Sequence, residues 1–371
     1  MNTIGENLKL TVYGESHGVS VGAVLDGLPP GETVDWDEVR REMARRAPGK
    51  NSMSTSRAEG DDFAVQSGYC NGHTTGTPLA VMIANSDVRS GDYDDLRHLM
   101  RPGHADYTGK IRYGGYNDYR GGGHFSGRLT APIVFAGAVA KQILARRGIR
   151  VGAHILQIEK VTDRPFNPLG EEPAVFERLA RETLPVLDKP QAGRMAEVIT
   201  AAKEDRDSVG GCIEAMITGL PAGYGDPLFD SVESGLARML FAVPAVKGLS
   251  FGDGFALAAM RGSVSNDAMY YDADGTVRTK SNHNGGINGG ITNGMPLVFR
   301  TVIKATASIG REQQTVDTDS EQNTTLIVKG RHDPCVRRFG AGRSTRGGDG
   351  GARVKTACHY WVFYAMITKC S

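Results

Sequence analysis

The sequence lacks a stretch of apolar residues long enough to cross a membrane. Its nearest approach is residues 360–367, a run of eight, whereas a membrane-spanning helix needs about 20. Residues 1–10 also lack the basic segment followed by an apolar one that directs secretion. We therefore expect neither a membrane protein nor a secreted one.

Cysteine is scarce, and its spacing fits neither disulfides nor a zinc site. The five cysteines form an odd set without a Cys-x-x-Cys pair: Cys70, Cys212, Cys335, Cys358 and Cys370. This pattern favours reduced thiols in a cytoplasm. The nine histidines are scattered, and the sequence contains neither a His-Glu-x-x-His nor an EF-hand pattern, so we expect no catalytic metal.

An excess of charge of one sign is also missing. The chain has 43 Lys and Arg residues against 42 Asp and Glu, so it creates no long-range field that would attract nucleic acid or an anionic membrane. With 40% hydrophobic and 23% charged residues, disorder is excluded as the main state. Glycine is abundant instead, at 49 of 371 residues, which indicates many sharp turns or close backbone approaches.

Strand-like and helix-like segments are mixed without strict alternation. Apolar and β-branched runs predict strands at residues 8–13, 19–25, 79–84, 149–158, 212–218 and 297–303. Apolar periodicity and capping residues predict helices at residues 33–46, 130–147, 174–184, 192–204 and 229–241. This order favours an α+β fold over a doubly wound parallel sheet.

Two glycine clusters, at residues 121–123 and 285–290, do not match the dinucleotide-binding or P-loop patterns. Their exposed backbone N–H groups can instead form an anion-binding concavity, or the glycines can lie flat against a planar ring. Any anion site that they build is therefore local rather than part of a standard nucleotide fold.

Four loops gather residue types that carry out chemistry. They are Gly14-Glu-Ser-His-Gly18, Arg101-Pro-Gly-His-Ala-Asp106, Tyr119-Arg-Gly-Gly-Gly-His-Phe-Ser-Gly-Arg128 and Lys329-Gly-Arg-His-Asp-Pro-Cys335. A loop of this kind can also be an ordinary capped turn that holds a surface salt bridge. Together they indicate a small substrate bearing phosphate and carboxylates, because arginines bind these anions and histidines exchange protons near neutral pH.

In their order along the chain, these loops resemble the chorismate synthase family over residues 1–336. The matching stretches are Gly14-Glu-Ser-His-Gly18, Arg101-Pro-Gly-His-Ala-Asp-Tyr107, Tyr119-Arg-Gly-Gly-Gly123, Ala245-Val-Lys-Gly248 with Gly252-Asp-Gly-Phe255, Ser281-Asn-His-Asn-Gly-Gly286 and Arg331-His-Asp-Pro-Cys335. The resemblance implies one catalytic domain over residues 1–336, folded as a β-α-β sandwich of antiparallel sheets with surrounding helices. It also implies a carbon–oxygen lyase that converts 5-enolpyruvylshikimate 3-phosphate to chorismate by a 1,4-anti elimination of phosphate.

The resemblance further implies a role for individual residues. The catalytic positions that it carries over are His17, which protonates the departing phosphate, His104, which serves reduced flavin, and Asp333 with Ser16, which assist deprotonation. The substrate-binding positions are Arg46, Arg101, Ser126, Arg128 and Arg331. The positions for reduced FMN are His124, Ser126, Pro244, Ala245, Gly289, Lys304, Ala305, Thr306, Ala307, Ser308 and Arg331.

The chain departs from the family pattern at two positions. His124 and Ser52 stand where many members have arginine, so one permanent cation becomes titratable and another is lost. The fungal type is longer and reduces its own flavin with NADPH. The length of this chain implies the monofunctional, bacterial type instead, with an external flavin reductant. The resemblance also implies a homotetrameric assembly, and we expect neither a membrane nor a nucleic acid as partner.

Residues 337–371 do not follow the family pattern. Residues 337–355 hold five Arg, one Lys, one Asp and six Gly, where the family has an Ala-rich helix. A reading-frame shift near codon 336 would produce this composition, and a flexible tail specific to the lineage is the alternative. The Arg/Gly-rich segment also resembles RNA-contacting tails, so an RNA-binding protein is the alternative function, and a flavin-dependent oxidoreductase is a third.

Overall fold

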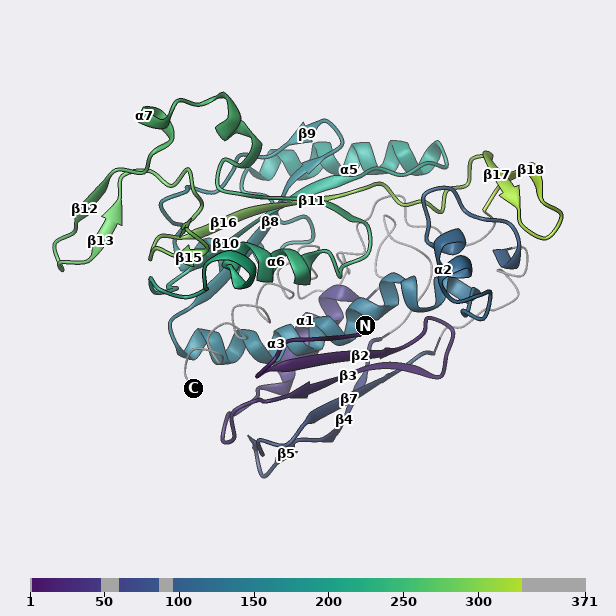
Figure 1. Cartoon of the computed structure of the whole chain (residues 1–371), viewed down its shortest axis with the longest axis horizontal. Helices are drawn as coiled ribbons and strands as arrows, with labels where there is room; N and C mark the ends of the chain where they lie inside the picture. The colour runs from purple at the N-terminus through teal and green to yellow at the C-terminus, as the bar shows by residue number, and fades with distance from the viewer. Residues whose placement is uncertain (1, 48–59, 87–95, 329–371) are drawn as a thin grey trace.

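The computed structural model describes residues 2–47, 60–86 and 96–328. These residues form three layers, in which two antiparallel sheets enclose a layer of helices (Figure 1). The α+β prediction is confirmed, and so is the β-α-β sandwich that the family resemblance implied. Layered folds of this kind bury one face of each sheet against the helices.

The first sheet carries the N-terminal part of the chain. Its antiparallel strands are, in spatial order, β1 (Thr3–Ile4), β2 (Lys9–Gly14), β3 (Ser20–Asp26), β7 (Leu79–Ala84) and β4 (Phe63–Ser67). Three of these strands confirm the predictions at residues 8–13, 19–25 and 79–84. β4 was missed because its residues are only partly buried at the edge of the sheet and show no apolar run.

The second sheet carries the C-terminal half. Its antiparallel strands are, in spatial order, β11 (Val246–Phe251), β16 (Leu297–Ile303), β10 (Gly211–Thr218), β8 (Arg150–Ile158) and β9 (Val161–Thr162). The predicted strands at residues 149–158, 212–218 and 297–303 are confirmed. A bulge between Cys212 and Ile213 shifts the register of β10 against β8.

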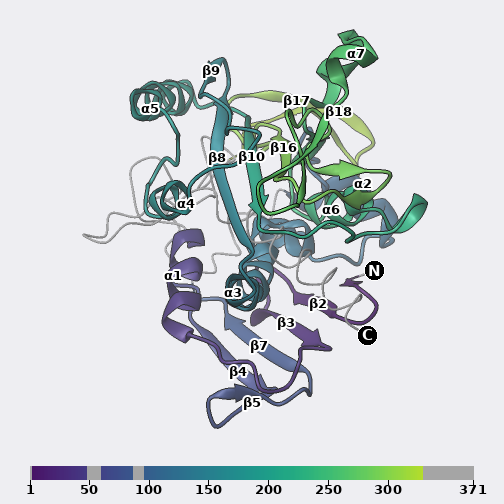
Figure 2. The same ribbon diagram turned by 90° about the vertical axis from the view of Figure 1, so that its left-hand side faces the viewer.

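Helices α1 (Trp36–Arg46) and α3 (Thr130–Arg146) form the middle layer, between the two sheets (Figure 2). The side chain of Asp35 caps α1 by accepting from the backbone N–H groups of Asp37 and Glu38. An ordinary surface helix is apolar on one face, but α3 is buried from Thr130 to Ala140 without interruption. Helix α3 contacts strands of both sheets. This explains why its own residues are apolar on every side.

Helices α4 (Pro173–Leu179) and α5 (Lys189–Glu204) pack against residues of the second sheet in two smaller apolar clusters outside the main core. Helix α6 (Val232–Leu240) instead buries Val232, Leu236 and Leu240 in the main core, which also contains α3 and strands of both sheets. The predicted helix at residues 174–184 ends early, at Leu179. After Leu179 the chain leaves the helical path, and the carbonyl of Pro185 accepts from the N–H of Ile155 on β8 at 2.7 Å.

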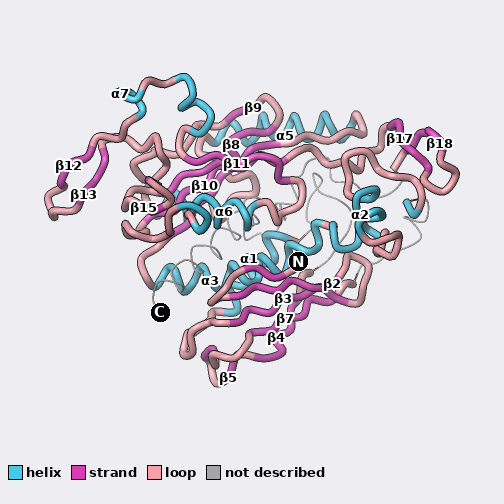
Figure 3. Tube along the Cα trace, viewed as in Figure 1, coloured by secondary structure: helices cyan, strands magenta, loops and turns pink. Residues whose placement is uncertain are grey.

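Short elements complete the described chain (Figure 3). They are the helices α2 (Asp106–Arg112) and α7 (Gly262–Ser265), the 3₁₀ segments η2 (Arg120–Phe125), η3 (Gly127–Leu129), η4 (Leu228–Asp230) and η5 (Gly254–Ala259), and the strand pairs β5–β6 (Tyr69–Cys70, His73–Thr74), β12–β13 (Met269–Tyr271, Val277–Thr279), β14–β15 (Ile287–Asn288, Ile291–Thr292) and β17–β18 (Gln313–Asp317, Gln322–Leu326).

One helical stretch, residues 120–146, is long and apolar enough to cross a membrane by length and composition. Within it, 89% of the most apolar window is buried inside the protein. This burial between two sheets is the environment of a core helix.

Candidate active site

The glycine turn at the start of η2 is the centre of the site. Gly121, Gly122 and Gly123 all have positive φ angles, 58°, 82° and 51°, a region that residues with a Cβ rarely adopt. The turn leads directly into Ser126 and η3, and from there into the buried helix α3. The buried helix α3 therefore fixes the position of a backbone turn that carries no side chains.

Ser16 and His17 lie against this turn. They belong to the loop between β2 and β3, and their exposed fractions are 0% and 7%. A Cβ on Gly121 would lie 2.1 Å from the Cε1 and Nδ1 atoms of His17 and 2.9 Å from Oγ of Ser16. The N–H of Ser16 also donates to the carbonyl of Gly123 at 3.1 Å. Only glycine at position 121 permits this approach.

His104 lies against the next glycine of the same turn. A Cβ on Gly122 would lie 3.3 Å from Cε1 of His104 and 3.4 Å from Nε2. Five described strands and the helix α1 separate His17 from His104 along the chain, yet the fold sets their imidazoles on adjoining glycines. Two groups that can exchange protons thus meet at one backbone turn.

Asp106 fixes the tautomer of His104. Nδ1 of His104 lies 2.6 Å from Oδ1 of Asp106, and Arg101 donates to the same carboxylate through Nε and Nη2, both at 2.7 Å. Because an ionised carboxylate only accepts hydrogen bonds, Nδ1 of His104 carries the proton. Nε2, the atom that faces Gly122, is then the basic nitrogen.

The electrostatics of this group keep the imidazole neutral. Burial lowers the pKa of His104, and the charges of Arg101 and Lys304 lower it further, against the opposing hydrogen bond to Asp106. Burial works against ionisation of Asp106, but the hydrogen bonds from Arg101 and His104 dominate and hold the pKa of this carboxyl well below its usual range. The arrangement is a neutral histidine oriented by a carboxylate that stays ionised.

The segment after β16 completes this side of the site. Nζ of Lys304 donates to the carbonyl of Gly103 at 2.5 Å, and Nη1 of Arg101 donates to Oγ of Ser308 at 2.9 Å. The backbone N–H of Lys304 donates to the carbonyl of Ala245, which follows Pro244, at 2.9 Å. The predicted cofactor positions Lys304 and Ser308 therefore contact the loop that carries His104, and Ala245 is hydrogen-bonded to Lys304.

The predicted substrate arginines Arg46 and Arg128 lie in a buried charge cluster with Asp61. Nε of Arg46 pairs with Oδ2 of Asp61 at 2.5 Å, and Nη1 of Arg128 pairs with Oδ1 of the same carboxylate. Burial opposes ionisation of Asp61, but the two guanidinium groups hold its pKa below the ordinary value. Ser126 lies beside the cluster, where its Oγ accepts from the N–H of Arg128 at 3.2 Å.

Other predicted positions fall at the edge of this arrangement or away from it. Nδ1 of His124 donates to the carbonyl of Gly14 at 2.9 Å, which places it at the base of the Ser16–His17 loop. Gly289 lies in the β14–β15 turn, which Figure 1 shows at the opposite end of the molecule from α2. Ser52, Arg331 and Asp333 lie outside the described residues.

Two acidic residues beside the turn were not predicted. Glu15 precedes Ser16, and its carboxyl shares a hydrogen bond with that of Asp118, which Arg120 holds through Nε and Nη2 at 2.8 Å each. Burial, followed by the charge of Asp118, raises the pKa of Glu15. The acidic residues in both loops were visible in the sequence, but their pairing depends on contacts between distant segments.

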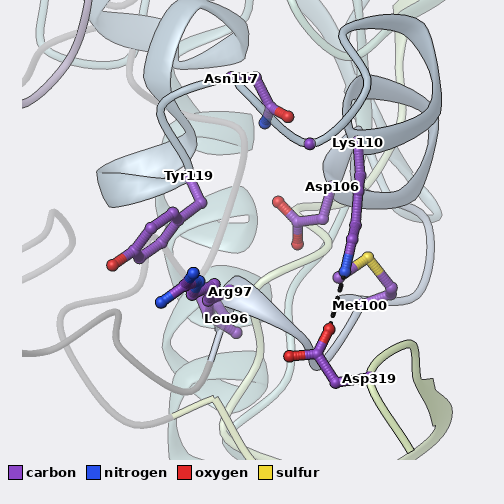
Figure 4. A pocket seen from close by; sticks show the side chains of 9 residues that line it. Leu96, Arg97, Met100, Asp106, Lys110, Asn117, Tyr119 and Asp319 are labelled. Atoms are coloured by element: carbon purple, nitrogen blue, oxygen red, sulfur yellow. Dashed lines mark hydrogen bonds and ion pairs between the residues drawn. The ribbon is translucent and has the colours of Figure 1, made fainter.

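A cavity of about 330 Å³ is lined in part by Asp106 (Figure 4). Lys110 and Asp319 close one wall of it with an ion pair of 3.1 Å. Its lining residues are Leu96, Arg97, Met100, Asp106, Lys110, Gly115, Asn117, Tyr119 and Asp319. Within residues 2–47, 60–86 and 96–328, no group of three or more His, Cys, Asp and Glu side chains could hold a metal ion.

Comparison with known proteins identifies the family. The family model described as chorismate synthase matches residues 8–340. Chorismate synthase of Porphyromonas gingivalis is 46% identical over 336 residues, which cover 91% of this chain and 90% of that protein. That of Korarchaeum cryptofilum is 43% identical over 334 residues, 90% and 91% of the two chains.

A solved structure of chorismate synthase has the same fold, with a TM-score of 0.74 at 23% identity over 99% of this chain and 93% of that one. These comparisons give no support to the interpretation of the chain as an RNA-binding protein. The family model and the relatives confirm the family resemblance, and the solved structure confirms the sandwich fold. The chain belongs to the chorismate synthase family.

Proposed function

We propose that this chain forms chorismate by the 1,4-anti elimination of phosphate from 5-enolpyruvylshikimate 3-phosphate. The observation that carries the proposal is the placement of His17 and His104 on adjoining glycines of one turn. An elimination of phosphate needs a proton donor for the leaving group and a group that handles the proton lost from carbon. Two imidazoles at one turn supply such groups.

The residues around the turn suit reduced FMN. The glycine backbone at residues 121–123 leaves a surface without side chains, against which a planar ring can lie. With Asp106 ionised, Arg101, Asp106 and Lys304 together leave one net positive charge on the His104 side, which favours an anionic flavin. When bound, reduced FMN would supply an electron to the substrate without net oxidation or reduction.

The roles of the protein groups follow from their positions. His17 protonates the departing phosphate, with Ser16 beside it. The neutral His104 would offer its basic Nε2 to reduced FMN bound at the turn, while Asp106 keeps Nδ1 protonated. Asp333 assists deprotonation, by family resemblance alone.

The substrate anions are assigned to arginines of these loops and to Arg46, the last residue of α1. Arg101 is held by Asp106 and Ser308, so its guanidinium is fixed before the substrate arrives. Arg46 and Arg128 share Asp61, which fixes their relative position in the same way. Ser126 and Arg331 complete the set that the resemblance assigns.

We further propose a homotetramer in the cytoplasm that receives FMN already reduced by an external reductant. Large apolar side chains on the described surface support the assembly: the exposed fraction is 89% for Phe229 and 88% for Phe255. Phe255 precedes the projecting arm that contains α7, β12 and β13 (Figure 1). Light scattering of the purified protein measures the assembly, and a monomeric mass would contradict it.

We keep the proposal that residues 337–371 arise from a reading-frame shift near codon 336. The abrupt change to Arg- and Gly-rich composition supports it, and the family model stops matching at residue 340. Restoring the other frame at codon 336 should raise the melting temperature. An equal melting temperature for the two chains would favour a tail specific to the lineage.

The elimination is tested by incubating the protein anaerobically with 5-enolpyruvylshikimate 3-phosphate and FMN reduced by dithionite. We expect one phosphate released per chorismate formed, and no release with oxidised FMN in air. The oxidoreductase alternative would instead consume reductant in proportion to product. Equal phosphate release under both conditions would contradict the proposal.

A further inference from the structure

We propose that Asn85 is a positioning residue that fixes the Ser16–His17 loop to the buried cluster of Arg46, Asp61 and Arg128. This inference rests on the proposed catalytic role of His17, and it adds a residue that acts through that histidine. Asn85 directly follows β7, the strand next to β3 in the first sheet. It is therefore placed where a sheet strand, the β2–β3 loop and η3 meet.

The side-chain amide of Asn85 spans the base of the catalytic loop. Its Nδ2 donates to the carbonyl of Glu15 at 2.9 Å and to the carbonyl of Gly18 at 2.8 Å. These two carbonyls lie immediately before and after Ser16 and His17 in the chain. One amide group thus holds both ends of the segment that carries the proton donor.

The other end of the amide reaches the charge cluster. Oδ1 of Asn85 accepts from Nε of Arg128 at 2.8 Å. Because carbonyls only accept and a guanidinium only donates, these three partners fix the orientation of the amide. Both N–H groups and the oxygen are engaged, and neither aspartate nor a shorter side chain reproduces that set.

The cluster gives the loop a rigid support. Arg128 donates from Nη2 to the carbonyl of Ala84 at 3.0 Å and pairs through Nη1 with Asp61, and Asp61 pairs with Arg46 of α1. The exposed fractions of Arg46 and Arg128 are only 2% and 1%. Functional side chains are held precisely when their supports are locked by packing and hydrogen bonds.

The glycine turn confines the loop from the other side. Gly123 accepts from the N–H of Ser16, and Gly121 lies against the His17 ring. Asn85 and the glycine turn therefore hold the Ser16–His17 loop from two sides. Without the hydrogen bonds of Asn85, only the glycine turn would hold the loop, and His17 would shift. A misplacement of about 1 Å can lower the rate by about 100-fold.

The direct test is Asn85→Asp in the full-length chain. This change keeps the shape and the acceptor for Arg128 but replaces the donor of two hydrogen bonds with an oxygen. We expect kcat for phosphate release to fall about 10- to 100-fold, with a smaller change in KM. The ¹³Cε1 resonance of His17, assigned with His17→Ala, should move in the same variant.

Asn282 offers a matched control. Its Nδ2 also donates to two carbonyls, those of Pro168 and Pro296 at 2.8 Å each, and its Oδ1 accepts from the N–H of Gly286 at 2.7 Å. Asn282→Asp removes the same kind and number of hydrogen bonds beside the second sheet. It should lower the melting temperature while leaving the His17 resonance in place.

The outcomes separate the inference from the function on which it rests. An unmoved His17 resonance and an unchanged kcat in Asn85→Asp would overturn the positioning role. A wild-type kcat in His17→Ala would instead overturn the proposed role of His17, and the resonance would still report on Asn85. If Asn85→Asp does not fold, Asn85→Ala removes the donor without adding a charge, and the same two results are expected.

Discussion

Each of the two sheets carries a buried charge cluster, and the two clusters serve different ends. The first, Arg46, Asp61 and Arg128, lies where α1, η3 and the first sheet meet, and its hydrogen bonds reach the Ser16–His17 loop through Asn85. The second joins four residues around the second sheet: His154, Asp163, Glu214 and Arg300. We call them the loop cluster and the sheet cluster.

The sheet cluster ties strands to the segments outside them. Nδ1 of His154 bonds Oδ2 of Asp163 and Nε2 bonds Oε2 of Glu214, both at 3.0 Å. The carboxylates in turn accept from the N–H groups of Phe166 and Leu187. All of these contacts hold chain segments together, and none of them involves the Ser16–His17 or Arg101–Asp106 loops.

The difference shows that burial of charge alone does not mark a functional site. Burying ions costs free energy in both clusters, and hydrogen-bonded partners offset that cost. What distinguishes the loop cluster is that its contacts continue into groups placed to move protons. The predictions below perturb one side of this comparison while holding the other fixed.

The largest effect should follow loss of either imidazole at the glycine turn. His17→Ala and His104→Ala should each lower kcat by about 10²- to 10⁴-fold, the range of general acid or base catalysis. His73→Ala is the control, because this exposed histidine is the first residue of β6, in the first half of the chain and away from the glycine turn in sequence. Steady-state phosphate release measures all three, and wild-type kcat in both site variants would show that neither imidazole moves a proton.

A smaller loss is expected from Gly121→Ala. The new Cβ would lie 2.1 Å from His17, so the loop must move in addition to the strain of a positive φ. Gly114→Ala introduces a Cβ at a nearly equal φ, 60° against 58°, with its nearest contact at 3.8 Å. Strain should lower the free energy of unfolding of both variants by about 1–2 kcal/mol. Only Gly121→Ala should also lower kcat, by about 10-fold or more. Equal kcat values for Gly121→Ala and Gly114→Ala would show that the close approach of His17 to Gly121 has no role in catalysis.

The sheet cluster should make stability depend on pH without changing the chemistry. Burial opposes protonation of His154, but its hydrogen bonds to Asp163 and Glu214 dominate and raise its pKa above the ordinary value of about 6.5. The folded state therefore binds a proton that the unfolded state releases above about pH 6.5. This stabilisation is complete below that pH and is lost as pH rises through the folded pKa.

The measurement is the melting temperature of wild type and His154→Gln between pH 6 and 9. The wild type should lose about 2 °C or more relative to the variant, which cannot titrate there. In acid, the partners Asp163 and Glu214 make stability depend on pH in the opposite direction. Hydrogen bonds from His154 help to lower the pKa of both carboxyls, so their stabilisation is lost as the pH falls. Parallel curves for the two proteins would mean that His154 is neutral in the fold.

The sequence predicted elements better than it predicted contacts. Six strands were found because apolar and β-branched runs end at glycine or polar residues, and the α1 cap was visible as Asp35 before an acidic first turn. The short strands and α2 lack such runs. Asp61 and Asn85 escaped notice because each is one polar residue at the end of a segment, and its importance comes from partners in other segments.

The central claim is that the loop cluster serves catalysis whereas the sheet cluster serves stability. The most direct test compares Asp61→Asn with Glu214→Gln, measuring the free energy of unfolding and kcat per folded molecule for each. Both changes remove one buried carboxylate charge and should cost about 3–5 kcal/mol. The account predicts a large loss of kcat for Asp61→Asn and a near wild-type kcat for Glu214→Gln. Equal losses of kcat in the two variants would contradict it.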